Sequence, residues 1–230
     1  MGGDHLKKIR FGVGGVLMMA AMLVSDSAMV IAVYLAAALW HEIGHILAAK
    51  LLRVGVKEIR LGFSGARIVT ERRLTSYKSE ILLSLAGPLA NVLACGGIVA
   101  VFCLLGEKSA GSNAIKEGIE AAAACAEAFL SFPRADFLGI LAFFALSSLI
   151  QAILNLLPVK TFDGGRILYC AVASLLGESA GARILTATTA FSTLILWIIA
   201  LYLMIKVGGG LGIYVFAACV FCGTMVKGEG

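Results

Sequence analysis

Residues 28 to 52 read AMVIAVYLAAALWHEIGHILAAKLL, an apolar run long enough for a helix to cross a bilayer. A helix rises about 1.5 Å per residue, so roughly 20 apolar residues span a hydrocarbon core of about 30 Å. Inside this run stand His41, Glu42 and His45. A carboxylate in the middle of a membrane helix costs about 2.5–3.5 kcal/mol on insertion scales, so this group indicates a polar pocket lined by protein.

The composition of the whole chain is that of a membrane protein. Of its 230 residues 60% are apolar and 14% are charged, whereas a soluble domain is about 45–50% apolar and about 25% charged. We therefore predict an all-α polytopic membrane protein. About six transmembrane helices are expected, at residues 11 to 24, 28 to 50, 81 to 105, 136 to 157, 184 to 205 and 211 to 226.

These helices are expected to form one integral-membrane domain covering residues 1 to 230. Its core is residues 28 to 170, and residues 184 to 226 supply the C-terminal helices. With six crossings both termini lie on one side of the membrane, and 15 of the 19 basic residues fall on that side, the others being Lys108, Lys116, Arg134 and Lys206. Basic loops face the cytosol, so both termini are predicted to be cytosolic. The net charge of +5 thus reflects topology, and no basic domain is available for binding nucleic acid.

The five residues from His41 to His45 form an H-E-x-x-H pattern within a helix. Residues four apart lie on one helix face, so both imidazoles can reach one metal ion while Glu42 addresses its water. A catalytic zinc usually holds three protein ligands and a water, so a third ligand must come from elsewhere. The remaining histidine, His5, lies in a charged N-terminal segment and is an unsuitable candidate.

Asp163 is the best candidate for the third ligand. It follows a long apolar run within the sequence NLLPVKTFDGG, residues 155 to 165. Pro158 cannot continue a regular helix and the two glycines free the backbone, so the chain can turn a carboxylate back toward the bundle. Asp163 could instead be an ordinary N-cap of a following helix. The ligand interpretation is favoured because helices 28 to 50 and 136 to 157 run in the same direction and bring the two motifs to similar depth.

Together these elements resemble the site-2 protease family of intramembrane zinc metalloproteases. That family pairs H-E-x-x-H with a distant motif of the type N-x-x-P-x-x-P-x-D-G-G. Residues 86 to 91, AGPLAN, resemble a third family element, G-P-x-x-N. The resemblance covers about residues 28 to 170. Thr161 stands in the place of the second proline, so the local shape before Asp163 departs from the pattern.

The resemblance implies roles for individual residues. His41, His45 and Asp163 would hold zinc, and Glu42 would act as the base that activates water. Asn155 would lie near the substrate peptide or its oxyanion. Asn91 would contact substrate or, alternatively, serve as an amide that packs the helices. Residues 54 to 70 resemble a membrane-reentrant β-hairpin after the second helix.

The predicted arrangement of six helices in one domain looks most like the sporulation-type branch of the family. The resemblance then implies a bacterial cell membrane location and, as substrate, a membrane-associated sigma-factor precursor. More broadly, the expected partners are a membrane protein or membrane-associated peptide substrate, the lipid bilayer and an inhibitory membrane protein. The rival interpretation is a non-enzymatic membrane protein that binds or transports a metal ion.

Overall fold

The structure, a computed structural model, describes residues 8–11, 28–53, 56–62, 65–70, 76–106 and 137–207. Their elements in chain order are the strand β1 (Lys8–Phe11), the helix α2 (Ala28–Leu51), the strands β2 (Val56–Gly62) and β3 (Gly65–Thr70), and the helices α3 (Tyr77–Gly106), α5 (Phe137–Leu156), α6 (Asp163–Leu176) and α7 (Glu178–Val207).

Four of the described helices, α2, α3, α5 and α7, are long and apolar enough to cross a membrane. They coincide with four of the six predicted crossings, and they identify the chain as a membrane protein. The predicted crossing at 211 to 226 lies outside the described residues, as does the one at 11 to 24 apart from its first residue. That residue, Phe11, ends strand β1 instead of beginning a helix.

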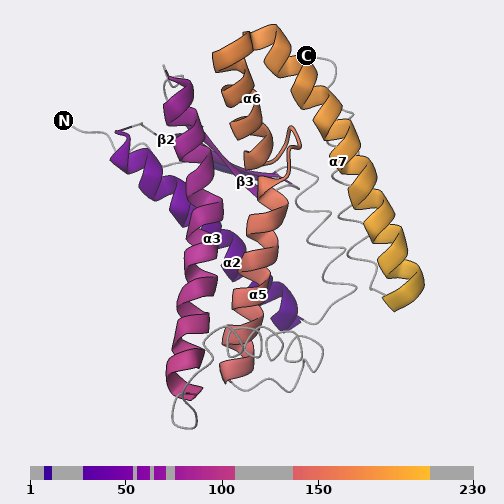
Figure 1. Cartoon of the computed structure of the whole chain (residues 1–230). Coiled ribbons are helices and arrows are strands. Elements are labelled where there is room, and N and C mark those ends of the chain that lie inside the picture. The colour runs from indigo at the N-terminus through magenta and orange to yellow at the C-terminus, as the bar shows by residue number, and fades with distance from the viewer. Residues whose placement is uncertain are drawn as a thin grey trace, which may run out of the picture.

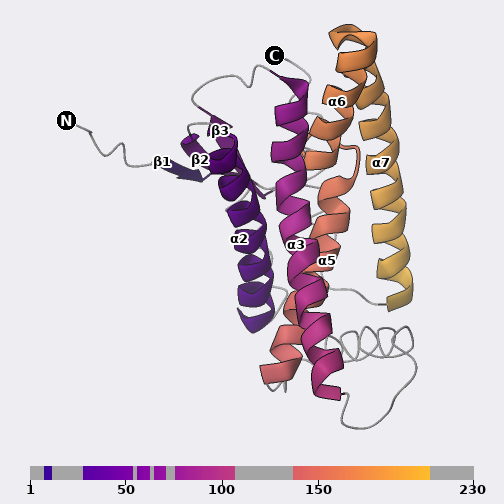
Figure 2. The ribbon, with the colours of Figure 1, turned by 60° about the vertical axis from the view of Figure 1, so that its left-hand side comes forward.

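The helices form a bundle in which α2, α3 and α5 pack against one another (Figures 1 and 2). Helices α2 and α5 run in the same direction and α3 runs against them. The shorter helix α6 packs against α3 and α7. The segments that carry the two sequence motifs therefore flank α3, which lies between them in the chain.

A three-stranded sheet lies beyond the C-terminal end of α2 (Figure 2). Strand β2 is central, with β3 antiparallel to it, so that Arg60 pairs with Arg67. Strand β1 pairs with β2 in parallel, which places Lys8 opposite Glu58. The pairing of β2 with β3 falls within the segment predicted as a hairpin, whereas its re-entry into the membrane stays a prediction.

Small residues allow α2 and α3 to cross at close range. A Cβ added to Gly44 would lie 2.5 Å from the carbonyl oxygen of Ala86 and 2.7 Å from Cβ of Ala90, so only glycine fits at this crossing. Next to it, the indole Nε1 of Trp40 donates a hydrogen bond of 2.9 Å to the carbonyl of Ala90. Helices in lipid gain little from burying apolar surface against each other, so such close packing and interhelical hydrogen bonds hold them together.

The turn between α5 and α6 is compact and folds back on itself. Phe162 N–H donates to the carbonyl of Val159 at 2.9 Å, and the side chains of both residues are buried. The two glycines of the D-G-G sequence lie directly against this turn. A Cβ on Gly164 would collide with the backbone carbonyls of Leu156 and Leu157, and one on Gly165 with that of Val159.

Replacing Gly164 by alanine should therefore destabilise the fold. The colliding atoms belong to the backbone and cannot move aside as a flexible side chain would. Overpacking of this kind typically costs about 1–3 kcal/mol, so the thermal unfolding midpoint of the purified protein in detergent should fall. Gly96→Ala is the matched control, because a Cβ there meets no atom of the described chain within 4 Å. A midpoint for Gly164→Ala equal to that of this control would contradict the close approach.

Candidate metal centre

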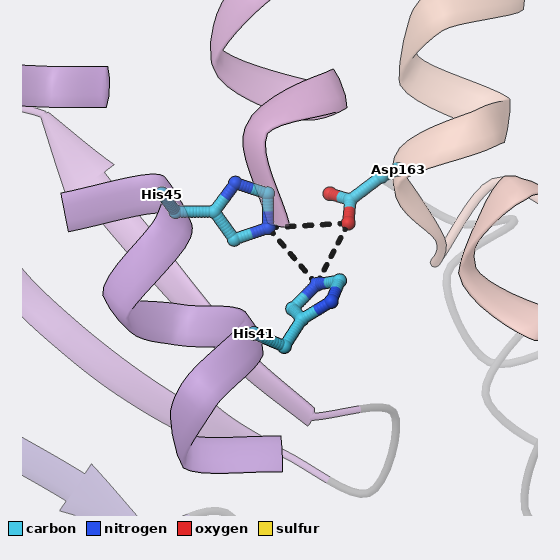
Figure 3. A group of neighbouring side chains, drawn as sticks. All are labelled: His41, His45 and Asp163. Atoms are coloured by element: carbon cyan, nitrogen blue, oxygen red, sulfur yellow. Dashed lines mark hydrogen bonds and ion pairs between the residues drawn. The ribbon is translucent and has the colours of Figure 1, made fainter. Parts of the chain in front are cut away.

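Two histidines of α2 and the first residue of α6 meet inside the bundle (Figure 3). Nε2 of His41 lies 3.0 Å from Nε2 of His45. Oδ2 of Asp163 lies 3.1 Å from the former nitrogen and 3.2 Å from the latter. Both imidazoles are buried and the carboxylate is partly buried. Residues more than a hundred positions apart thus converge on one point.

The three atoms are spaced as ligands of one small metal ion. Zinc binds imidazole nitrogen and carboxylate oxygen at about 2.0–2.2 Å, so neighbouring tetrahedral ligands lie about 3.3–3.6 Å apart. The separations of 3.0–3.2 Å differ from this by a few tenths of an ångström. Two nitrogens and one oxygen are also a donor set found in catalytic zinc sites. The group could therefore hold a metal and fits zinc.

The backbone of α3 lies directly against this group at Gly87. A Cβ added to Gly87 would collide with Nε2 of His45 and lie 2.5 Å from Nε2 of His41. A side chain at this position would thus occupy the space around the ligand atoms. Glycine at position 87 leaves room for both imidazoles and for an ion between them.

The second nitrogen of each imidazole also has a partner on α3. Nδ1 of His45 lies 2.7 Å from the carbonyl oxygen of Leu83. A carbonyl only accepts hydrogen bonds, so Nδ1 carries the proton in this contact. Nδ1 of His41 lies 3.4 Å from the side-chain amide of Asn91. Partners of this kind orient ligating histidines in metal sites and fix which nitrogen is free to bind.

Asp163 begins α6, and the N-cap position is taken by Phe162. The capping alternative is therefore wrong, because the carboxylate of Asp163 faces the two histidines. Burial raises the pKa of this carboxyl, but the hydrogen-bonding contacts with both imidazoles outweigh that effect and lower the pKa to about 2. Asp163 is thus an anion at neutral pH, as a metal ligand must be.

Two contacts fix the segment that carries Asp163. The backbone N–H of Lys160 donates to the hydroxyl of Thr189 on α7 at 3.0 Å. On α6, Nε of Arg166 lies 3.1 Å from a carboxylate oxygen of Glu80 on α3. The turn is thereby attached to α7 on one side, and α6 to α3 on the other.

The other predicted site residues occupy different surroundings. Glu42 follows His41 in α2 and has one buried carboxylate oxygen. Asn155 lies half-buried in the last turn of α5. Asn91 is fully buried and lies behind His41. Asn91 therefore contacts a residue of the candidate metal centre and is not exposed on the surface of the described chain.

Sequence reasoning did not assign roles to Gly87 and Thr189. The first stood in the recognised AGPLAN element, but sequence alone does not say which face of α3 a glycine occupies. The second belongs to a row of buried hydroxyl residues on α7, Thr189, Ser192 and Thr193. Polar residues three and four apart on a membrane helix are a usable signal for a polar contact with a neighbouring element.

Comparisons with known proteins show the family and the fold of the chain. The model of peptidase family M50 matches residues 28–199, which is more than half of the chain. Among solved structures, the chain is similar to the site-2 protease from Methanocaldococcus jannaschii, with a TM-score of 0.62 and 18% sequence identity. The likeness covers 96% of this chain and 91% of that one and concerns the fold. No curated protein sequence matches the chain.

Replacing Gly87 by alanine should abolish metal binding, because the added Cβ would displace the imidazoles that carry two of the ligand atoms. Elemental analysis of purified protein should find less than about a tenth of the wild-type zinc, in line with loss of two of three ligands. Gly97→Ala on the same helix is the control, since a Cβ there meets no described atom within 4 Å. Wild-type zinc content in Gly87→Ala would show that α3 does not border the metal.

Proposed function

The chain belongs to peptidase family M50, and on that premise we propose that it is an intramembrane zinc metalloprotease. The observation that carries the proposal is the convergence of His41, His45 and Asp163 within 3.2 Å of one another. Two of these residues lie in the interior of a helix long and apolar enough to span a membrane. Placing ionisable groups there is costly, so a functional site is the best explanation for them.

We assign zinc to the Nε2 atoms of the two histidines and to the carboxylate of Asp163. A zinc ion bound there supplies Lewis acidity, which polarises a carbonyl group and lowers the pKa of a coordinated water to about 7. His41, His45 and Asp163 would hold the ion as its three protein ligands, the number that catalytic zinc sites usually have beside water or substrate. The two contacts at Nδ1, to Leu83 and Asn91, keep the Nε2 atoms directed at the ion.

We assign the role of general base to Glu42. It stands next to His41 on the helix that supplies two ligands, and its carboxylate is partly buried. In peptide hydrolysis it would take a proton from the attacking water and deliver that proton to the leaving amine nitrogen. Asn155, in the last turn of α5 near the Asp163 turn, is our candidate for contacting the substrate peptide or its oxyanion.

The substrates are, on this proposal, single-span or membrane-associated proteins. A helical substrate must unwind locally, since its carbonyls are engaged in the helix and shielded from attack. A membrane-associated sigma-factor precursor is the more specific candidate, and it is supported by the resemblance of the sequence to the sporulation-type branch of the family. Proteins that accumulate uncleaved in cells carrying a Glu42→Gln variant would identify the substrate.

Glu42→Gln should keep zinc and lose hydrolysis. The amide preserves the shape of the side chain but cannot take a proton from water. General-base catalysis contributes about 10²–10⁴-fold, so cleavage of a single-span substrate by purified protein in detergent should fall by at least about a hundredfold. Elemental analysis should find wild-type zinc in the same sample.

Treatment with a chelator is the companion experiment. It should stop cleavage by the wild type, and added zinc should restore it. Asp163→Ala should lose zinc as well as activity, which separates a missing ligand from a missing base. A non-enzymatic metal-binding or transport protein would cleave nothing under any of these conditions, and that result would reject the proposed function.

The cleaved bond should lie near the cytosolic boundary of the membrane. Basic residues follow α2 and precede α3, so charge bias assigns the C-terminal end of α2 to the cytosol. His41 and His45 lie in the C-terminal half of that helix. Mass spectrometry of the fragments gives the cleavage position. A cut at the opposite face would contradict the assigned orientation.

A further inference from the structure

Asn91 is a fully buried polar residue whose side chain has one hydrogen-bonding contact within the described residues, with His41. Its Nδ2 lies 3.4 Å from Nδ1 of that histidine, and its Oδ1 has no partner in the described part of the chain. Burying an amide with one end unpaired is unfavourable. An asparagine used only to pack two helices gains nothing here over an apolar side chain of similar size, so the contact with His41 is the feature that needs explaining.

Which atom of this contact carries the proton depends on metal binding by His41, so the inference rests on the proposed function. A histidine that binds zinc through Nε2 must offer a lone pair there, and a neutral imidazole then carries its proton on Nδ1. Nδ1 of His41 accordingly needs an acceptor. The amide oxygen and nitrogen of an asparagine have nearly the same shape, and half a turn of the amide exchanges them. Oδ1 of Asn91 then accepts a hydrogen bond from Nδ1–H of His41.

His45 shows the same requirement met by a different group. Its Nδ1–H donates to the backbone carbonyl of Leu83, which leaves Nε2 free to bind metal. Nδ1–H of His45 thus donates to a main-chain oxygen, whereas Nδ1–H of His41 donates to a side-chain oxygen. The main-chain acceptor is present whatever residue occupies position 83, whereas the acceptor for His41 depends on the residue at position 91.

The position of Asn91 on α3 supports this role. Gly87 and Asn91 are four apart, so they lie on the same face of the helix. The first borders the Nε2 atoms of the histidines and the second reaches Nδ1 of His41. One turn of α3 therefore makes space for the ligand atoms and directs one of the rings that carry them. We propose that Asn91 is a positioning residue that fixes the tautomer and ring orientation of His41 for zinc binding.

The test is the zinc dissociation constant of the purified protein in detergent, measured by competition with a chromophoric chelator. Asn91→Leu keeps the number and branching of the side-chain heavy atoms and removes the acceptor, so zinc should bind about 10–100-fold more weakly, the usual effect of losing such a partner. Asn91→Asp keeps an acceptor oxygen in the same place, so its zinc affinity should equal or exceed that of the wild type. A packing role predicts no change of zinc affinity in either variant.

A second pair of variants tests the same role if the Asn91→Asp variant does not fold. Asn91→Ser retains a hydroxyl acceptor and should bind zinc more tightly than Asn91→Ala. Equal dissociation constants for Asn91→Leu and the wild type, or for the serine and alanine variants, would overturn the positioning role. Absence of zinc binding by the wild type would instead overturn the proposed function. The two failures are therefore distinguishable without measuring proteolysis.

Discussion

The close crossing of α2 and α3 is the constraint on which the centre depends. Gly44 on α2 lies against the backbone of α3, and Gly87 on α3 lies against the imidazoles of α2. Each helix thus contributes a glycine at the point where the other comes nearest. In lipid such contact holds helices together through van der Waals attraction and hydrogen bonds. The same approach brings the carbonyl of Leu83 and the amide of Asn91 to the outer nitrogens of the histidines.

The third member of the candidate metal centre, Asp163, is positioned by a different part of the fold. Proline ends the regular path of α5, and a short turn with buried Val159 and Phe162 reverses into α6. The glycines after Asp163 let α6 begin directly against this turn. A hydroxyl of α7 then accepts from the backbone of Lys160. The position of the Asp163 carboxylate is thereby fixed by the turn that precedes it and by the helix that follows it. Helix α7 supports the turn but contributes no residue to the candidate metal centre.

Much of this could be predicted from sequence, because charged and polar groups are conspicuous in apolar helices. His41 and His45 stood out for that reason, whereas Asp163 stood out because it follows an apolar run and a proline. Four helices lie where the apolar runs predicted them. For Asp163 the residues alone fit both a helix cap and a metal ligand, and only the predicted direction of two helices favoured the ligand. Pairing of β1 with β2 joins segments almost fifty residues apart and leaves no local pattern. The role of Gly87 was hidden because it depends on the distance between two helix backbones.

The separation of the ligands along the chain has a consequence for biosynthesis. His41 and His45 leave the ribosome 122 and 118 residues before Asp163. Membrane helices are made and inserted in order from the N-terminus, so a nascent chain that contains only α2 and α3 has two ligands and no third. The centre is completed only after α5 has been inserted and the turn into α6 has formed. An unfinished chain therefore lacks one of the three groups that could hold a metal, so on the proposed function it would not hydrolyse the membrane proteins being inserted beside it.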